Sequence, residues 1–193
     1  MTRCSWPGTD ELYIKYHDEE WGEPVHDDTR HFEFLVLEAA QAGLSWITIL
    51  KRRENYRKAY LGFDPKIVAS FTDKDEERLL QDAGIIRNRL KIKSSIQNAR
   101  RFLEVQKEFG SFDSYLWGFV DGKPVVNGWE EISQIPPKTE LSDRISKDLK
   151  KRGFSFVGST IIYSHLQAVG VVNDHIVSCF RYREVQKTAL ARR

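Results

Sequence analysis

The two cysteines of this 193-residue chain lie near its opposite ends, and each has a histidine in its neighbourhood. In the stretch VVNDHIVSC, His175 and Cys179 would lie on one face if residues 173 to 180 are helical, because side chains four positions apart are neighbours on a helix. Cys4 and His17 form a second pair near the start of the chain. Two thiolates and two imidazoles can complete the tetrahedral shell of one zinc ion. Two inert buried thiols are the other interpretation that these residues allow.

The composition indicates a globular protein, since 40% of the residues are apolar and 12% are aromatic. That content is ample for one domain or for two small lobes that share a core. The sequence has no run of eighteen apolar residues and no signal-peptide pattern, so we expect a soluble, cytoplasmic protein with no membrane association. In a reducing compartment the two cysteines are not expected to form a structural disulfide. A net charge of +2 permits nucleic-acid binding without requiring it.

Apolar residues recur at helical spacing along most of the chain. The predicted helices cover residues 28–60 in two parts broken at Gly43, 73–84, 89–110, about 140–153, and a segment that starts near Gly158. The stretch FVDGKPVVNG predicts either one short hairpin or a loop, because its proline opposes strand pairing. Residues 183–193 are predicted to form a charged, solvated tail. We therefore predict an all-α chain that forms a single unit over residues 1–193.

A short turn, GFSFVG, joins the last two of these predicted helices and follows three cations. Glycines at both ends of the turn let the backbone approach a partner, and free amides at a helix N-terminus bind anions. The groups that could contact phosphate belong to Lys150, Lys151, Arg152, Gly153, Gly158, Ser159 and Thr160. This pattern predicts sequence-independent contact with the phosphate backbone of a nucleic acid. An ordinary helix-helix connection with a solvated basic end is the alternative.

Several long motifs, in this order, resemble those of the bacterial DNA-3-methyladenine glycosylase I family: YIKYHDEEWG, QAGLSWITILKRRENYRKAY, DAGIIRNRLKI, KKRGFSFVGSTI and VNDHIVSC. The resemblance runs from about Arg3 to about Cys179. It implies the helix-hairpin-helix fold of base-excision DNA glycosylases, with two helical lobes around a base-binding cleft. It further implies that the chain acts as a monomer on double-stranded DNA that contains alkylated bases, with free 3-methyladenine as the product.

The resemblance also implies one zinc ion, held by Cys4, His17, His175 and Cys179, and no organic cofactor. Four protein ligands leave no position for water, so such an ion is structural rather than catalytic. It would join the N- and C-terminal segments of the chain. A metal-dependent hydrolase is excluded on the same ground, because no coordination position stays open for a substrate.

Glu38 interrupts the otherwise apolar segment FEFLVLEAAQAGLSW. Gln41 and Ser45 lie on the same side of a helix as Glu38 and would give it a narrow polar stripe. Such a stripe faces either bulk solvent or a cleft, and the residues alone leave both interpretations open.

For the pocket that receives a flipped base, the resemblance implies the residues Glu38, Tyr16 and Trp46, with Trp21 and Tyr13 close by. These residue types suit adenine alkylated at N3, which is cationic in DNA. Aromatic faces attract its positive charge, and a carboxylate accepts hydrogen bonds from its amino group. We therefore expect hydrolysis of the N-glycosidic bond, which leaves an abasic site. A non-catalytic DNA-binding module is the alternative function.

Three further predictions concern residues outside the base pocket and the Cys/His set. Leu44 could enter the duplex as a wedge where the base has left, with core packing as the alternative. Many helix-hairpin-helix glycosylases carry a catalytic Asp in a stretch that resembles VNDHI, and Asn173 occupies that place here. We expect that Asp174 does not substitute for it, because one residue turns a helix by about 100°. No lysine stands where a Schiff-base nucleophile is expected, which predicts a monofunctional glycosylase.

Overall fold

The structure is a computed structural model that describes residues 2 to 191, with side chains described up to residue 188. Its helices in chain order are α1 (Glu11–Glu19), α2 (Asp28–Gln41), α3 (Trp46–Leu50), α4 (Arg53–Ala59), α5 (Pro65–Ala69), α6 (Asp73–Gln81), α7 (Arg89–Phe109), α8 (Phe112–Gly118), α9 (Glu140–Lys151), α10 (Ser159–Ala168) and α11 (Phe180–Ala191). Two 3₁₀ turns, η1 (Leu61–Phe63) and η2 (Ile132–Gln134), and two short strands, β1 (Val125–Val126) and β2 (Val172–Asn173), complete the described elements. The prediction of a helical chain is confirmed.

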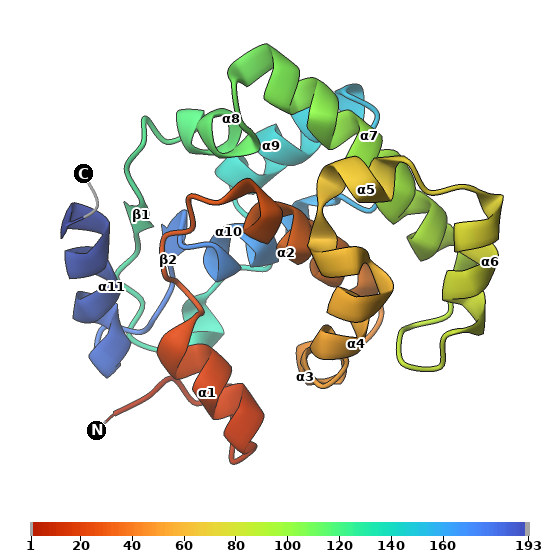
Figure 1. Ribbon diagram of the computed structural model, residues 1–193. Coiled ribbons are helices and arrows are strands. Elements are labelled where there is room, and N and C mark those ends of the chain that lie inside the picture. Colours follow the sequence, from red (N-terminus) through yellow and green to blue (C-terminus); the bar gives the residue numbers. More distant parts are fainter. Residues whose placement is uncertain (1, 192–193) are drawn as a thin grey trace.

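Helix α2 lies at the centre of the molecule and packs against α3, α7, α8 and α10 (Figure 1). Its residues from His31 to Ala40 are all buried, as its nearly continuous apolar sequence predicts. Asp27 caps its first turn by accepting a hydrogen bond from the backbone N–H of Arg30, at 2.9 Å. A polar side chain on this helix is therefore surrounded by protein, unless a cavity reaches it.

Residues 28–60 differ from the prediction of two long helices. They form three helices, α2, α3 and α4, because the chain turns at Gly43, which has a φ of +78°, and again at Lys51 and Arg52. The short helix α3 between these turns lies across the end of α2. This arrangement places Trp46 against α2.

The stretch at residues 119–128 does not form a hairpin. Asp121 and Gly122 make a turn with positive φ, and β1 then pairs in parallel with β2, with Val125 opposite Val172. Pro124 has no N–H to donate to a neighbouring strand of its own segment, which explains why the local pairing fails. The pairing instead connects the middle of the chain to the segment after α10.

The end of the chain is also more ordered than the sequence predicts. Residues 183–191, which we expected to belong to a solvated tail, continue α11, and the charged side chains of Arg183, Glu184 and Lys187 are exposed. Val185 is only 2% exposed, so the helix has an apolar contact that fixes it to the rest of the protein. Arg192 and Arg193 lie outside the described residues. The N-terminal segment lies beside the start of α11, where the backbone N–H of Phe180 donates to the carbonyl of Thr2 (Figure 1).

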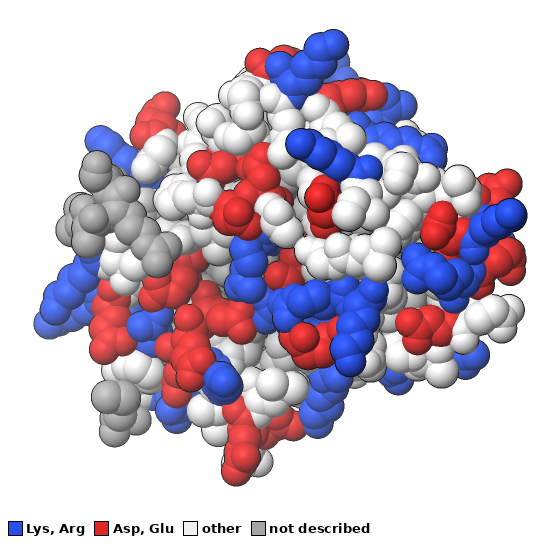
Figure 2. Space-filling view, viewed as in Figure 1, with Lys and Arg blue, Asp and Glu red and all other residues white. Residues whose placement is uncertain are grey.

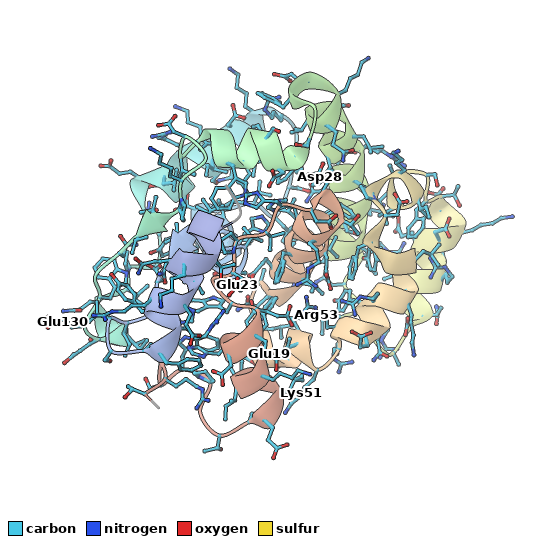
Figure 3. The ribbon with its side chains drawn as sticks, turned by 60° about the vertical axis from the view of Figure 1, so that its left-hand side comes forward. Glu19, Glu23, Asp28, Lys51, Arg53 and Glu130 are labelled. Carbon is cyan, nitrogen blue, oxygen red and sulfur yellow. The ribbon has the colours of Figure 1, made fainter. Side chains whose placement is uncertain are left out.

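Ion pairs hold α1 against the α3–α4 segment. Lys51 pairs with Asp10 at 2.8 Å, and Arg53 pairs with Glu20 at 2.8 Å and with the buried Glu33 at 2.8 Å. Figure 3 shows Lys51 and Arg53 on the side of this segment that faces α1. On the face shown in Figure 2, Lys and Arg side chains gather over α4 next to acidic side chains. Much of the positive charge on that face is therefore engaged by carboxylates.

Among residues 2 to 191, no helix has both the length and the apolar character needed to cross a bilayer.

Gly170 closes the turn after α10 at a point where two backbones touch. Its φ is +70°, and a Cβ at this position would lie 2.5 Å from the carbonyl carbon of Glu23 and 2.5 Å from the nitrogen of Pro24. Nearby, the N–H of Val25 donates to the carbonyl of Val169 at 3.0 Å. This close approach joins the segment after α1 to the end of α10, which are two parts of the chain that the site described below requires together.

Gly170→Ala is expected to lower the free energy of unfolding by roughly 3 kcal/mol or more, because neither backbone can move away without losing its hydrogen bonds. Gly62→Ala is the matched control, since Gly62 has a similar φ of +79° but no atom within 4 Å of an added Cβ. That variant is expected to lose only about 1–2 kcal/mol, from backbone strain. Urea unfolding of both proteins tests this, and equal losses would contradict the close-packing argument.

Candidate functional site

The four predicted metal ligands come together in one buried cluster. The Sγ atom of Cys179 lies 3.6 Å from Nε2 of His17 and 3.6 Å from Nδ1 of His175, and Sγ of Cys4 lies 3.7 Å from Nδ1 of His175. All four ligand atoms lie within 4.8 Å of one another. Zinc bonds to sulfur and nitrogen in a tetrahedral site imply S···N separations of about 3.6 Å. The cluster therefore has the geometry and donor types of a metal site.

Outer contacts orient both imidazoles toward the cluster. Nδ1 of His17 lies 2.7 Å from a carboxylate oxygen of Asp18, which in turn accepts a hydrogen bond from Arg3. Nε2 of His175 lies 3.0 Å from the backbone carbonyl of Trp21. Each ring therefore donates through one nitrogen to an oxygen and turns its other nitrogen to the cluster, as metal-binding histidines do. Hydrogen bonding from Cys4, and then from the two imidazoles, lowers the pKa of Cys179 and favours its thiolate.

The backbone that delivers His175 and Cys179 is not helical, contrary to the expectation for residues 173–180. Asn173 ends β2 and accepts a hydrogen bond from the N–H of His175, and a turn then places the N–H of Cys179 2.8 Å from the carbonyl of Ile176. The turn, rather than the helical spacing, brings the two side chains together. Because residues 173 and 174 are not helical, the helical rotation of about 100°, from which we expected that Asp174 does not substitute for a catalytic Asp at position 173, does not apply.

A cavity of about 340 Å³ lies beside the Cys/His cluster. The residues that line it are Trp6, Tyr13, Tyr16, Trp21, Glu38, Gln41, Trp46, Ile132, Ile135, Ser164 and Gln167. The five residues predicted for the base pocket are all in this set. They come from α1, α2, α3 and the segment after α1, so the α1–α3 contacts described above determine the shape of the cavity.

Aromatic rings form most of the wall. Trp6 packs edge-on against Tyr13 at a ring-centroid distance of 4.8 Å and against Trp21 at 5.1 Å. Tyr16 and Trp46 lie 5.5 Å apart, with tilted rings. Trp21 also contacts the ring of His175 at 4.6 Å, which links the wall of the cavity directly to the Cys/His cluster. Such a wall offers π faces to a flat ligand and attracts positive charge.

Glu38 points its carboxylate into this aromatic surrounding. The residue is 4% exposed, and no described residue forms a hydrogen bond or ion pair with its side chain. Desolvation by burial raises the pKa of Glu38 to about 8, because nothing nearby stabilises the charged form. The stripe of Glu38 and Gln41 therefore faces a cleft and not bulk solvent. A buried acid of this kind gains most from a ligand that carries positive charge or donates hydrogen bonds.

A second cavity, of about 310 Å³, adjoins the first and shares Glu38, Gln41 and Ser164 with it. It is lined by Glu38, Gln41, Ala42, Gly43, Leu44, Thr160, Ile161 and Ser164. It therefore joins the aromatic cavity to the turn after α2 and to the start of α10.

Leu44 lies at the exposed end of this second cavity, which we call the mouth, and is 41% exposed. The alternative prediction, that Leu44 packs in the core, is therefore wrong. Lys91 of α7 fixes the turn that carries Leu44. The Nζ atom of Lys91 donates to the carbonyl of Ala40 at 2.8 Å and to that of Ala42 at 2.6 Å. These bonds satisfy carbonyls that the end of α2 leaves without helical partners. An exposed leucine on a rigid turn is thus presented beside the cavity.

The predicted hairpin is present between α9 and α10, and α7 holds its turn in place. Asn98 donates to the carbonyl of Ser155 at 2.9 Å and accepts from the N–H of Ser155 at 2.9 Å. Gly158 is the N-cap of α10, and no side chain caps that helix. The first amides of α10, at Ser159 and Thr160, are thereby left without a side-chain partner at the mouth of the cavity.

The three cations before the hairpin turn differ in their surroundings. Lys150 and Lys151 are exposed. Arg152 instead forms hydrogen bonds to Asp148 at 2.7 Å and to Glu108 at 2.6 Å. Its guanidinium also lies over two aromatic rings of the neighbouring helices. Arg152 is therefore engaged within the protein, and only the two lysines present unpaired charge at this place.

Sequence reasoning missed several residues of the cavity. Trp6 carried no signal beyond that of a core aromatic, and Ile132 and Ile135 belong to a loop with no recognisable pattern. Ser164 and Gln167 are spaced three apart in the apolar helix α10, like Glu38 and its partner on α2. This spacing of three was the one sequence signal available for these cavity residues. It indicates a second polar stripe, on α10, opposite the stripe of Glu38 and Gln41 on α2.

Comparison with known proteins agrees with this geometry. The sequence model of the methyladenine glycosylase family matches residues 6–182. The chain belongs to this family. Its catalogued relatives include DNA-3-methyladenine glycosylase 1 of Escherichia coli (strain K12), which is 53% identical over 182 residues, or 94% of this chain and 97% of the relative. The family resemblance predicted from the motifs is thereby confirmed.

Solved structures of methyladenine glycosylases have the same fold as this chain. A crystal structure of 3-methyladenine DNA glycosylase I superposes with a TM-score of 0.90 at 52% identity, over 93% of this chain and 98% of the other. The Staphylococcus aureus enzyme, whose structure describes its recognition of 3-methyladenine, superposes with a TM-score of 0.90 at 37% identity. That alignment covers 93% of this chain and 96% of the other.

Replacing Glu38 with glutamine is expected to stabilise the free protein, and increasingly so as the pH rises. The unfolded chain releases the Glu38 proton near pH 4.5, whereas the folded protein retains it up to about pH 8. Stability due to this group is therefore present at low pH and lost between these values. Glu38→Gln does not lose stability in this way. Its free energy of unfolding should therefore exceed that of the wild type by an amount that grows from near zero at pH 4.5 to roughly 4 kcal/mol at pH 8.5. Urea unfolding at both pH values measures it, and a pH-independent difference would contradict the burial argument.

Proposed function

We propose that this protein hydrolyses the N-glycosidic bond of 3-methyladenine in alkylated double-stranded DNA. The reaction releases the free base and leaves an abasic site for base-excision repair. The observation that carries the proposal is an unpartnered carboxylate, Glu38, in an aromatic cavity that opens at a helix-hairpin-helix unit. Membership of the methyladenine glycosylase family supports it, as does the name of the E. coli relative.

In this proposal the lesion leaves the base stack and enters the aromatic cavity. Tyr16 and Trp46 offer their ring faces to the purine, with Tyr13 and Trp21 close by. Adenine alkylated at N3 carries a positive charge in DNA, and normal adenine does not. Ring faces attract that charge, and Glu38 accepts a hydrogen bond from the amino group. Discrimination therefore rests on charge and on a hydrogen-bond donor.

The charge of the lesion also bears on the chemical step. The alkylated base departs as a neutral molecule, so its bond to the sugar is already weak and no strong acid is required. A cationic base that enters the cavity favours the ionised form of Glu38, whose pKa in the free cavity is about 8. The carboxylate and the rings then stabilise the positive charge that develops as the bond breaks, and water attacks the sugar carbon.

Phosphate contacts are assigned to the hairpin. Exposed Lys150 and Lys151 and the uncapped amides at the start of α10 suit a DNA backbone beside the cavity mouth. Gly153 and Gly158, at the two ends of the turn, let that backbone approach closely. Arg152 supports the hairpin through its ion pairs and is not assigned a phosphate. We assign Leu44 the role of the wedge that fills the space left by the flipped base.

The proposed reaction is monofunctional. Among the described residues that line the cavity there is no lysine that could form a Schiff base with the sugar. Borohydride treatment during turnover is therefore expected to trap no covalent adduct between protein and DNA. A trapped adduct that depends on the alkylated base would contradict this part of the proposal.

We also propose that the Cys/His cluster holds one structural zinc ion. The donor set, its burial and the oriented imidazoles all suit Zn²⁺. Cys4 and His17 belong to the first segment of the chain, and His175 and Cys179 to the last. The ion would therefore fix the segment that carries Trp21 against α10, without taking part in the chemistry.

Glu38→Gln is expected to reduce release of 3-methyladenine from alkylated duplex DNA by at least about a hundredfold, since a neutral amide does not stabilise a cationic base. High-performance liquid chromatography of the released bases measures this. Glu77→Gln is the matched control, because Glu77 is an exposed glutamate of α6, and no residue of α6 lines either cavity. Wild-type turnover by the folded Glu38 variant would remove Glu38 from the proposal.

Metal analysis of purified protein is expected to give one zinc per chain. Cys179→Ala should lose the metal and lower the melting temperature strongly, because structural zinc contributes directly to folding free energy. Glu38→Gln should retain a full equivalent of zinc and so separates metal loss from loss of activity. Protein that is folded, active and free of zinc after dialysis against a chelator would overturn the zinc assignment.

A further inference from the structure

Asp174 is a buried carboxylate that accepts four hydrogen bonds from neutral groups. Its side chain is 1% exposed. Oδ1 accepts from Nδ2 of Asn127 and from Nε1 of Trp129, each at 2.7 Å. Oδ2 accepts from the hydroxyl of Tyr163 and from Nε2 of Gln167, the latter at 2.7 Å. Four donors fill the acceptor positions of the carboxylate oxygens, which explains how this polar group is buried without a cation beside it.

One of these four donors, Gln167, also lines the aromatic cavity. A carboxylate accepts hydrogen bonds and does not donate, so the amide nitrogen of Gln167 has to face Asp174. The carbonyl oxygen Oε1 then points away from Asp174, and no described residue donates a hydrogen bond to it. Asp174 thereby fixes Gln167 in a single orientation that turns an acceptor toward the cavity.

Gln167 lines the part of the cavity that lies away from Leu44, which we call the inner end. The second cavity, at Leu44, shares Glu38, Gln41 and Ser164 with the aromatic cavity, but Gln167 lines only the aromatic cavity, together with Trp6 and Trp21. A base that enters from the mouth leaves its sugar outside and brings its far edge to the inner end. In adenine that far edge carries the exocyclic amino group.

We propose that Gln167 is a specificity-determining residue, whose fixed carbonyl oxygen accepts one hydrogen of the exocyclic amino group of the bound base. Glu38, on the opposite wall, accepts the other hydrogen. Asp174 is the positioning residue that prevents the amide from rotating. This inference rests on the proposed function and adds a selection rule to it: bases with an amino group at this edge are accepted, and bases with a carbonyl oxygen there are rejected, because two acceptors would face each other.

Asp174→Asn provides a sharp test, because its effect on Gln167 follows from the donors around it. Asparagine has one acceptor oxygen and one donor NH₂ group. The indole N–H of Trp129 can only donate, so the oxygen of the new side chain has to face Trp129. Its NH₂ group then faces Tyr163 and Gln167, both of which can accept. Gln167 is thereby expected to rotate and to present its own NH₂ group to the cavity.

The experiment measures the dissociation constants of two free bases, 3-methyladenine and 3-methylhypoxanthine, which carries oxygen in place of the amino group. Wild-type protein is expected to prefer 3-methyladenine. In Asp174→Asn the ratio of the two constants is expected to shift toward 3-methylhypoxanthine by about a hundredfold, since one hydrogen bond is lost for one base and gained for the other. In Gln167→Met, which offers neither group, the expected shift is about tenfold.

Asn127→Ala is the matched control, because it removes a donor from the other oxygen of Asp174 and leaves the Gln167 contact in place. Its base preference is expected to stay at the wild-type value. An unchanged preference in both test variants would overturn the proposal, and Gln167→Met alone decides if Asp174→Asn does not fold. A wild-type protein that releases no base from alkylated DNA would instead contradict the proposed function, so the two failures are distinguishable.

Discussion

Burial of the Glu38 carboxylate without a partner costs several kcal/mol when the group is ionised, and the protein tolerates it because the proton is retained. The position of this residue makes the burial unavoidable. Helix α2 runs through the centre of the fold. The residues next to Glu38 on this helix are core residues that pack on α7, α8 and α10. A carboxylate fixed on that helix cannot turn to bulk solvent. It is therefore available only to a ligand that enters the cavity, and a cationic one gains most.

The remaining elements shape the walls around this group. Ion pairs from Lys51 and Arg53 hold α1, with its tyrosines, against the α3–α4 segment. On the other side, the contact at Gly170 and the Cys/His cluster join the segment after α1 to the end of α10. His175 contacts Trp21 through both its ring and its hydrogen bond, so the Cys/His cluster and the aromatic wall form one connected structure. The cluster thereby helps to define the pocket without contributing a side chain to its lining.

The sequence predicted those features that depend on residue type and local pattern. Cysteine and histidine are rare enough here that the four members of the Cys/His cluster could be predicted before the fold was known, and the glycine-flanked hairpin follows from its turn chemistry. Features that depend on tertiary structure could not be predicted. The turn at His175 replaces a helix because β2 pairs with β1, a contact between distant segments. Gln167 looks like any polar residue on a buried helix until Asp174 and the cavity are placed around it.

The ionisation of Glu38 tests this account most directly. Selective ¹³C labelling of glutamate allows its carboxyl carbon to be titrated by nuclear magnetic resonance, with Glu38→Gln identifying the signal. The account predicts a pKa near 8 in the free protein. It also predicts a large decrease of that pKa on binding 3,9-dimethyladeninium, a permanently cationic base with a methyl group in place of the sugar. A pKa near the ordinary glutamate value of about 4.3, unchanged by the cation, would contradict the account.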